Sequence, residues 1–383
     1  MSAIGIHDIH AATAHHVLDL DLLAAHRDVD PAKYRLGLGQ DRMSVPAPDE
    51  DAVTMGASAA AALLRRTGTD GIRALLFATE SGVDQSKAAG VYAHRLLGLP
   101  PQVRTAELKQ ACYGGTAALQ TAIGLVARNP DDRVLVIASD VARYALDSPG
   151  EPTQGAGAVA MLVSADPALV EIEPVSGLST ADVDDFWRPN DRDVPVVDGR
   201  LSVDAYLDAL TSAWDDFRAR GGADVSRIDR FVHHQPYTKM ARKAHARLAE
   251  HTGAGIGADL IEDGLADNRQ IGNSYTASLY LGLCSLLRRD DSLAGKRIGL
   301  FSYGSGSVSE FFTGVVRPGY ADAMRAAGGM DLDARAPLDL DAYRALHASS
   351  GARSDDAETP RVTTAPFRFA GVRGRARVYE ATA

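Results

Sequence analysis

Short, continuous apolar runs that end in small or polar residues recur along the chain. They comprise residues 74–78, 134–138, 158–163, 231–233 and 298–301. Runs of this length are typical of strands that are buried on both faces. Segments with helix-like patterns lie between them, at residues 54–66, 116–128, 239–251 and 273–289. This alternation of strands and helices predicts an α/β protein whose sheet is largely buried beneath helices.

The rhythm of strands breaks near the middle of the chain. Residues 165–167 predict a turn, and a new apolar–polar alternation begins at residues 169–172. In each half, reactive side chains come directly after predicted strands, and they are Glu80, Cys112, His234 and Ser305. We therefore expect two similar α/β halves, residues 1–165 and residues 166–383.

The composition narrows the classes of function. With 45% hydrophobic and 23% charged residues among 383, the chain is typical of a folded globular protein of one large or two smaller domains. The formal net charge of −10 argues against a broad nucleic-acid or anionic-membrane surface. No Lys or Arg precedes Arg27, which argues against a secretory signal, and the longest apolar run is far shorter than the ~20 residues of a membrane span. We expect a cytoplasmic protein without nucleic-acid or membrane partners.

The two cysteines differ in their surroundings. Because only Cys112 and Cys284 are present, a disulfide framework and a multi-cysteine zinc site are excluded, and no metal is expected. Cys284 lies among leucines in a predicted helix and is interpreted as a buried structural thiol. Cys112 lies in ACYGGTAA at the start of a predicted helix, where the dipole and free amides favour the thiolate that attacks carbonyl carbon. Its two following glycines would let a substrate approach the backbone closely.

Further polar residues follow other predicted strands. His234, in FVHHQPY, can donate to or protonate an oxygen near neutral pH. Strand alternation points His233 the other way, and we interpret it as a histidine that hydrogen-bonds the backbone. Asn273 opens the predicted helix in IGNSYTAS. It either points an amide at a carbonyl oxygen or serves only as an N-cap.

Glu80 and Ser305 complete the set of candidates. A carboxylate at a buried strand end has a raised pKa that suits proton transfer, although a surface turn is the usual place for a glutamate such as Glu80. Ser305 lies in FSYGSGS, a loop whose amides could form an oxyanion hole or cradle a phosphate. The chain has no GxxxxGK[ST] motif and no well-placed GxGxxG motif, so nucleotide hydrolysis and dinucleotide redox chemistry have no support.

Taken together, these motifs resemble those of the hydroxymethylglutaryl-CoA (HMG-CoA) synthase family of the thiolase superfamily, in its bacterial mevalonate-pathway form. The matching blocks in chain order are GLGQDRMSVP (37–46), ATESGVDQSK (78–87), ELKQACYGGTAAL (107–119), SDVARY (139–144), GEPTQGAGAVAML (150–162), DFWRP (185–189), HHQPYTKM (233–240), IGNSYTASLYLGL (271–283) and FSYGSGSVSEFF (301–312). The glutamate of ATESG is peculiar to this branch of condensing enzymes. The resemblance therefore favours a catalytic role for Glu80.

The resemblance implies a fold, an assembly and a reaction. The fold is thiolase-like, with two similar α/β halves stacked as layers of helix, sheet, helix, sheet and helix, and the assembly is a homodimer. The reaction is an acyl transfer followed by a Claisen-type condensation of acetyl-CoA with acetoacetyl-CoA, which gives HMG-CoA and free CoA. It is an early step of the mevalonate route to isoprenoids. Both thioesters are substrates, and no cofactor is implied.

The resemblance also implies roles for the candidate residues. Cys112 would carry the acetyl group as a thioester, Glu80 would take a proton from its methyl group, and His234 would polarise and protonate the ketone oxygen. Asn273 would hold the acetoacetyl group. The backbone amides of Cys112 and Ser305 are candidates for the thioester oxyanion hole.

Other residues are candidates for binding or support. Lys239 and Lys243 are four apart on a predicted helix, so they share a face that either binds the CoA phosphates or is simply solvated. Tyr144 and Thr153 match positions that line the substrate tunnel of the family. Asp140 and Asp185 also lie in matching blocks, and we interpret them as structural supports for the site.

Two features depart from the family pattern. His233 occupies a position that is commonly apolar or aromatic, which could alter the tuning of His234. The polar residues 349–361 have no clear match, and they predict a mobile loop before a final strand at residues 367–379.

Three other functions remain alternatives. A polyketide β-branching synthase would act on a carrier-protein-bound β-ketoacyl group, but GEPTQGAGAVAML is closer to the mevalonate-type enzymes, and Arg242 and Lys243 alone do not form a docking patch. An acetoacetyl-forming condensing enzyme would lack Glu80. A non-catalytic thiolase-fold scaffold would have lost at least one of Glu80, Cys112 and His234, and all three are present.

Overall fold

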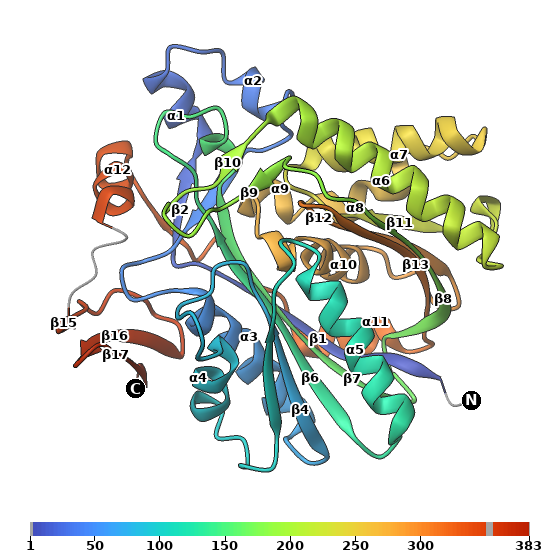
Figure 1. Cartoon of the computed structure of the whole chain (residues 1–383), viewed down its shortest axis with the longest axis horizontal. Helices are drawn as coiled ribbons and strands as arrows, with labels where there is room; N and C mark the ends of the chain where they lie inside the picture. The colour runs from blue at the N-terminus through green and yellow to red at the C-terminus, as the bar shows by residue number, and fades with distance from the viewer. Residues whose placement is uncertain (1–2, 350–354, 383) are drawn as a thin grey trace.

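Strands from both halves of the chain join in one large sheet. The computed structural model describes residues 3–349 and 355–382. The first half contributes β1 (Ile4–Thr13), β4 (Ile72–Ala78), β5 (Arg104–Leu108), β6 (Arg133–Ala142) and β7 (Gly155–Ala165). The second half contributes β8 (Val170–Thr180), β11 (Arg230–His233), β12 (Arg297–Gly304) and β13 (Val308–Val316). Within those described ranges the spatial order is β11-β12-β13-β8-β1-β7-β6-β4-β5 (Figure 1).

The two groups of strands meet at β1. This strand pairs along most of its length with β7, and it meets β8 through Gly5↔Glu171 and Ile6↔Val170. A Cβ atom on Gly5 would lie 2.1 Å from the carbonyl oxygen of Val170, so only glycine permits this approach. β4 runs parallel to β5 and β6, and β11 runs parallel to β12, whereas the other neighbours in the sheet are antiparallel.

Helices and sheet alternate in layers (Figure 1). The first-half strands are covered on their outer face by α3 (Ala52–Thr67) and α4 (Ala89–Leu96). The central layer holds α5 (Gly114–Arg128) and α10 (Ser278–Arg289), and the second-half strands are covered by α6 (Gly199–Ala219) and α7 (Thr238–Thr252). The first-half strands and the second-half strands of the sheet form two separate layers. In the described part of the chain the order is therefore helix, sheet, helix, sheet, helix, which confirms the predicted thiolase-like fold.

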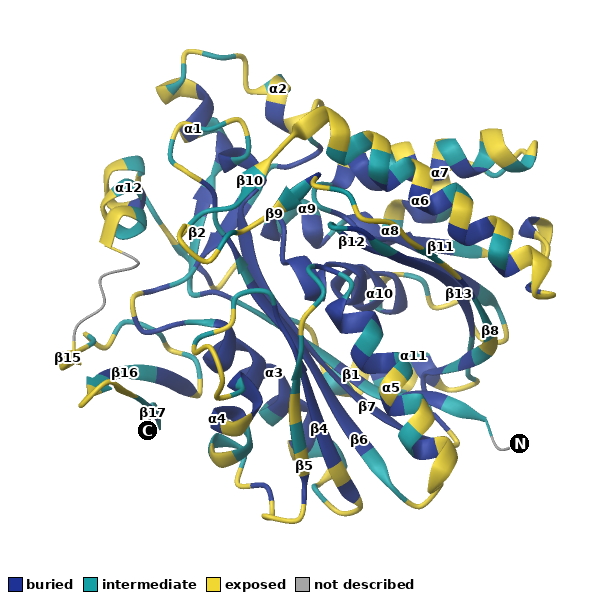
Figure 2. Cartoon of the chain, viewed as in Figure 1, coloured by how far each residue is buried: buried dark blue, intermediate teal, exposed yellow. Residues whose placement is uncertain are grey.

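Successive side chains along a strand point to opposite faces of the sheet and pack into different hydrophobic clusters. On β4, Leu76 faces the core around α5 and α10, whereas Phe77 faces α3 and α4. On β12, Leu300 joins the same central core and Phe301 faces α6 and α7. These strands are therefore buried on both faces (Figure 2), which explains their continuous apolar sequences.

Smaller elements surround this framework. A side sheet of β2 (His16–Asp19), β3 (Arg42–Val45) and β14 (Ala336–Pro337) lies near the helices α1 (Leu20–His26), α2 (Ala32–Arg35) and α12 (Leu340–Ser349). A C-terminal sheet lies beside α3 and α4 and contains β15 (Ala357–Glu358), β16 (Phe367–Arg373) and β17 (Ala376–Ala381). The remaining elements are β9 (Phe186–Trp187), β10 (Val196–Val197), α8 (Glu262–Leu265), α9 (Asn268–Ile271), α11 (Tyr320–Ala327) and the 3₁₀ turns η1 (Glu151–Thr153), η2 (Val225–Arg227), η3 (Ala258–Ile261) and η4 (Tyr275–Ala277).

The strands and helices named from the sequence are present, with three differences. The helix predicted from residue 273 begins at Ser278, after the turn η4. The predicted strand 367–379 is two strands, β16 and β17. Of the predicted loop 349–361, residues 350–354 lie outside the described residues, and β15 occupies part of the remainder. Over the described ranges, no helix has the length and apolar character that a membrane crossing requires.

Candidate active site

Cys112 lies in a tight turn between β5 and α5. The residue before it, Ala111, has φ = 42°, a left-handed conformation that is uncommon for a residue with a side chain. The helix begins at Gly114, and a Cβ atom on Gly115 would lie 2.5 Å from the carbonyl oxygen of Thr276. Glycine thus lets the turn η4 pack directly on the start of α5, beside a cysteine that is 9% exposed.

Glu80 is the side-chain partner of this cysteine. The Cys112 Sγ–H donates to Glu80 Oε1 across 3.2 Å. Burial, followed by the negative charge of Asp140, raises the pKa of Glu80 to about 8, as expected from a carboxylate at a buried strand end. Burial and the Glu80 charge also raise the pKa of the Cys112 thiol well above its usual value. The expectation of a thiolate favoured by the helix start is therefore wrong, and the thiol instead faces a neighbouring base.

Asp140 fixes the strand end that carries Glu80. Its fully buried Oδ1 accepts hydrogen bonds from the backbone N–H groups of Glu80 and Ser81, both at 2.9 Å, and from Thr79 Oγ1 at 2.7 Å. Its Oδ2 accepts the backbone N–H of Thr276 at 3.0 Å. One carboxylate thus ties the end of β4 to η4, in agreement with the supporting role expected for it.

Asp185 fixes the loop that contains Ser305. The buried Asp185 Oδ1 accepts the backbone N–H of Gly306 at 2.9 Å. Gln110 Nε2 donates to the Ser305 carbonyl at 3.3 Å, and a Cβ atom on the glycine before Ser305 would lie 2.5 Å from the Gln110 carbonyl oxygen. The structure therefore brings the Ser305 loop against the turn that carries Cys112.

His234 follows the end of β11 and is 1% exposed. Its backbone N–H donates to the Phe301 carbonyl at 2.8 Å, and its own carbonyl accepts the hydroxyl of Tyr206 at 2.7 Å. No group among residues 3–349 and 355–382 hydrogen-bonds its buried Nε2 atom. Burial lowers the pKa of His234 to about 3, so the ring is neutral at pH 7. The sequence suggested a histidine that titrates near neutral pH, whereas the structure offers a neutral ring with a spare nitrogen.

His233 points to the opposite face of β11, as strand alternation predicted. Its ring stacks on Phe231 in parallel, and Nε2 lies 3.3 Å from His245 Nδ1. The expected hydrogen bond to the backbone is therefore wrong, because the partner is another imidazole ring.

Asn273 belongs to a turn rather than to the start of α10. Its Oδ1 accepts the backbone N–H of Tyr275 at 3.0 Å, and Tyr275 has φ = 44°. The N-cap interpretation is therefore wrong for this helix, whose first residue is Ser278. The side chains of both Tyr275 and Asn273 interact with the phenol of Tyr144.

An aromatic group forms one side of the Cys112 surroundings. Cys112 packs with Tyr275 and Phe186, and the ring of Phe186 lies 6.1 Å from Tyr144 and 5.9 Å from Tyr275. Burial, together with the nearby Cys112 and Glu80, raises the pKa of Tyr144 to about 12. The sequence had singled out Tyr144 but not Tyr275 or Phe186, although both lie inside matching blocks.

Thr153 is buried and bonded to Asn273, whereas the two lysine candidates are exposed. The hydroxyl of Thr153 donates to the Gly150 carbonyl at 2.7 Å, and its backbone carbonyl accepts the N–H of Asn273 at 3.0 Å. Lys239 and Lys243 are exposed and four residues apart on α7. The structure does not place these lysines among the neighbours of Cys112.

Two further sequence expectations concern metal binding and the second cysteine. Within the part of the chain that the structure describes, no group of three His, Cys, Asp or Glu side chains could hold a metal ion. Cys284 is a free thiol buried in α10, as predicted, and burial raises its pKa.

Two family models match the chain. The model "Hydroxymethylglutaryl-coenzyme A synthase N terminal" matches residues 2–168, and its C-terminal counterpart matches residues 170–252 and 258–341. The hydroxymethylglutaryl-CoA synthase of Enterococcus faecalis is 44% identical over 91% of this chain and 92% of its own length. The polyketide biosynthesis 3-hydroxy-3-methylglutaryl-ACP synthase PksG of Bacillus subtilis is 34% identical over 87% of this chain and 85% of its own.

Solved structures give the same result. A crystal structure of an HMG-CoA synthase complexed with CoA superposes with a TM-score of 0.93 at 37% identity, covering 99% of this chain and 100% of that one. MvaS in complex with 3-hydroxy-3-methylglutaryl coenzyme A gives a TM-score of 0.91 at 36% identity, covering 100% and 99%.

Proposed function

The chain belongs to the hydroxymethylglutaryl-CoA synthase family, and we propose that its active site joins acetyl-CoA to acetoacetyl-CoA, releasing HMG-CoA and free CoA. The observation that carries this proposal is the 3.2 Å contact between the Cys112 thiol and the Glu80 carboxylate, whose pKa is raised to about 8. It pairs a nucleophile with a base in a partly buried site. Related structures are complexes with CoA and with HMG-CoA, which supports CoA thioesters as the substrates.

The first step is acetyl transfer to Cys112. The sulfur attacks the acetyl carbonyl carbon, and the bond from that carbon to the CoA sulfur breaks. The thiol proton passes to Glu80, which Sγ already faces, and from there to the departing CoA thiolate. Glu80 is then ionised again, ready to act as a base. Backbone amides of Cys112 and Ser305 would stabilise the oxyanion, each contributing a few kcal/mol (~3) if well aimed.

The second step is condensation. Glu80 removes a proton from the methyl group of acetyl-Cys112, and the resulting enolate carbon attacks the ketone carbon of acetoacetyl-CoA. The ketone oxygen becomes an alkoxide, and the unpaired Nε2 of His234 would donate a hydrogen bond to it in the tautomer that carries the proton there. The proton that Glu80 took from the methyl group passes to the alkoxide, which leaves Glu80 ionised again and the His234 ring neutral. Asn273, beside Tyr144, would hold the acetoacetyl group.

The third step is hydrolysis. Water adds to the carbonyl carbon of the enzyme thioester, the bond to Cys112 breaks, and the product leaves with a free carboxylate and a released proton. No cofactor enters these steps. Thr153 and Tyr144 would line the substrate tunnel, and the exposed Lys239 and Lys243 would bind the CoA phosphates.

A β-branching synthase that accepts a carrier-bound β-ketoacyl group is the second candidate, because PksG is also a relative. Identity favours the CoA-dependent enzyme, at 44% against 34%. Charge also favours it, because Arg242 forms a two-bond ion pair with Glu262, which reduces the positive charge that α7 would present to an acidic carrier protein. The experiment is product analysis by mass spectrometry with acetyl-CoA and either acetoacetyl-CoA or an acetoacetyl carrier protein. HMG-CoA from the first mixture supports the proposal, and product only from the second contradicts it.

The proposal extends to the chain's organisation. Residues 1–165 and 166–383 would be two thiolase-like halves, which is supported by the origin of β1 to β7 before the division and of β8 to β13 after it. A homodimer is expected from the family resemblance, and light scattering would test it. Action in the cytoplasm, with HMG-CoA feeding the mevalonate route, agrees with Cys112 and Cys284 being free thiols.

A further inference from the structure

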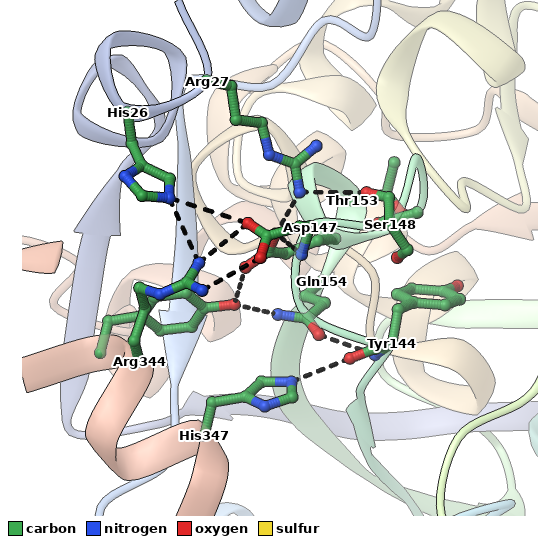
Figure 3. A network of polar contacts seen from close by, with 12 residues as sticks. His26, Arg27, Tyr144, Asp147, Ser148, Thr153, Gln154, Arg344 and His347 are labelled. Atoms are coloured by element: carbon green, nitrogen blue, oxygen red, sulfur yellow. Dashed lines mark hydrogen bonds and ion pairs between the residues drawn. The ribbon is translucent and has the colours of Figure 1, made fainter. Parts of the chain in front are cut away.

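Helix α12 lies against the segment that carries Tyr144 and Gln154, although the family match ends at residue 341, just inside the helix. Tyr343 anchors the helix, because its ring is 1% exposed and packs with apolar side chains from α1, β2 and β3. From this anchored helix, His347 reaches toward Tyr144 (Figure 3). The helix therefore contacts a segment near Cys112 that is distant from it in sequence.

His347 holds the peptide groups around Tyr144. Its Nε2 lies 2.8 Å from the Tyr144 carbonyl oxygen. A carbonyl can only accept, so Nε2 carries the proton in this contact. In return, Arg143 Nη2 donates to the His347 carbonyl at 2.6 Å. Burial, followed by the Arg143 charge, lowers the pKa of His347 and so favours the neutral ring.

Gln154 links the other backbone group of Tyr144 to the same helix. Gln154 Oε1 accepts the Tyr144 N–H at 2.7 Å, and Nε2 donates to Tyr343 Oη at 2.7 Å. The Tyr343 hydroxyl donates in turn to Glu151 Oε1 at 2.8 Å. Glu151 is fully buried and pairs with Arg27. Both backbone polar groups of Tyr144 are thus held by side chains that belong to α12 or bond to it (Figure 3).

The segment that contains Tyr144 and Thr153 also contacts Asn273, the residue proposed to hold the acetoacetyl group. The phenol of Tyr144 interacts with Tyr275 and Asn273, and the Thr153 carbonyl accepts the backbone N–H of Asn273 at 3.0 Å. Cys112, by contrast, is positioned by the turn before α5 and by Glu80. A shift of α12 would therefore move Tyr144 and Asn273 directly, and it would reach the nucleophile only through the rings of Tyr275 and Phe186.

We propose that Tyr343 and His347 are positioning residues for the condensation step, acting through Tyr144 and Asn273 on the acetoacetyl group. The inference rests on the proposed function, because it assigns these residues to the second substrate and not to acetyl transfer. A misplacement of about 1 Å in a positioning group can slow a reaction by roughly 10²-fold. We therefore expect a selective loss of condensation, larger for His347 than for the single hydroxyl of Tyr343.

The test compares His347→Ala, His347→Gln and Tyr343→Phe with Asp341→Asn, an exposed residue in the first turn of α12. His347→Ala should lower kcat/KM for acetoacetyl-CoA by about 10- to 100-fold. His347→Gln keeps a donor near the Nε2 position and should recover to within about threefold of wild type. Tyr343→Phe keeps the buried ring and should lower kcat/KM by about three- to tenfold.

A second readout separates positioning from general damage. Acetylation of Cys112 by acetyl-CoA alone, followed by intact mass, should stay within about twofold of wild type in every variant, because α12 does not hold that turn. The proposal is overturned if His347→Ala condenses as well as Asp341→Asn, or if acetylation falls in the same proportion as condensation. Equal kinetics of the Ala and Gln variants would also overturn it.

Failure of the proposed function has a different signature. Wild-type protein that forms acetyl-Cys112 but does not condense acetoacetyl-CoA would contradict the function, and the variants would then be compared by hydrogen exchange. Faster exchange at the Tyr144 amide in Tyr343→Phe and His347→Ala than in Asp341→Asn would support positioning by α12. Unchanged exchange would overturn it.

Discussion

Replacing Glu80 with glutamine removes the proposed base while keeping its size. The backbone of residue 80 stays fixed, because Asp140 accepts its N–H at 2.9 Å and Arg188 donates to its carbonyl at 3.2 Å. Removing a general base slows a proton transfer by about 10²–10⁴-fold, equivalent to about 3–5 kcal/mol of activation free energy. Glu80→Gln should therefore lose condensation by this factor. Cys112 should still become acetylated, but more slowly than in wild type, because its thiol proton also passes to Glu80.

The wild-type pH profile gives an independent check on the same residue. With a pKa of about 8, Glu80 is roughly one-tenth ionised at pH 7 and nine-tenths ionised at pH 9. Condensation measured by single-turnover formation of HMG-CoA should thus rise about tenfold over this range. A Glu80→Gln protein that condenses within about threefold of wild type, or a wild-type rate that is flat from pH 7 to 9, would refute the assignment.

The same carboxyl group also changes stability with pH. Its folded pKa of about 8 lies above the ordinary 4.5, so the neutral form is favoured by folding. This contribution is fully present below about pH 4.5 and is lost as the pH rises through about 8. The free energy of unfolding of wild type should therefore fall by at most about 5 kcal/mol between pH 5 and pH 9. Glu80→Gln lacks this titration, so its stability relative to wild type should rise over the same range. Urea unfolding at both pH values measures the gain, and a difference that shrinks toward pH 9 would contradict the raised pKa.

The remaining predictions concern the other groups of the site. His234→Ala should slow condensation by about 10²–10³-fold, and the wild-type profile should show no step near pH 6.5, because the pKa of His234 is about 3. Asp140→Ala should lower the unfolding free energy by about 3–5 kcal/mol in urea titrations, because it leaves several buried donors unpaired. The double variant of Lys239 and Lys243 to alanine should raise KM for CoA thioesters by about three- to tenfold at low salt, and less at high salt. The same variant should leave KM unchanged for a short thioester without phosphates, and an equal rise for both would remove the lysines from phosphate binding.

Residues that lie directly after buried strands could be predicted from the sequence. The apolar run before Glu80 could be assigned to a strand because it is short and continuous and ends in polar residues, as expected for a strand that is buried on both faces. The glycines after Cys112 were expected to let a substrate approach the backbone, whereas in the structure Gly115 lets the Thr276 carbonyl pack against the start of α5. The layered fold then came from the resemblance of ordered motifs.

Properties that depend on burial could not be predicted. The neutral ring of His234 and the raised pKa of the Cys112 thiol come from desolvation by elements far away in sequence. The turn at Asn273 was missed because a helix pattern gives no sign of the left-handed φ at Tyr275. The role of α12 was also invisible, since the hydrogen bond from His347 to Tyr144 spans 203 residues of sequence.

The proposed mechanism depends above all on a covalent acetyl intermediate on Cys112. The most direct test is intact-protein mass spectrometry after mixing with acetyl-CoA, followed by a chase with acetoacetyl-CoA or with an acetoacetyl carrier protein. We predict an acetyl adduct that is absent from Cys112→Ser, and that acetoacetyl-CoA clears with the appearance of HMG-CoA. Clearance only by the carrier-bound substrate would contradict the CoA-dependent reaction, and the absence of any adduct would contradict the mechanism.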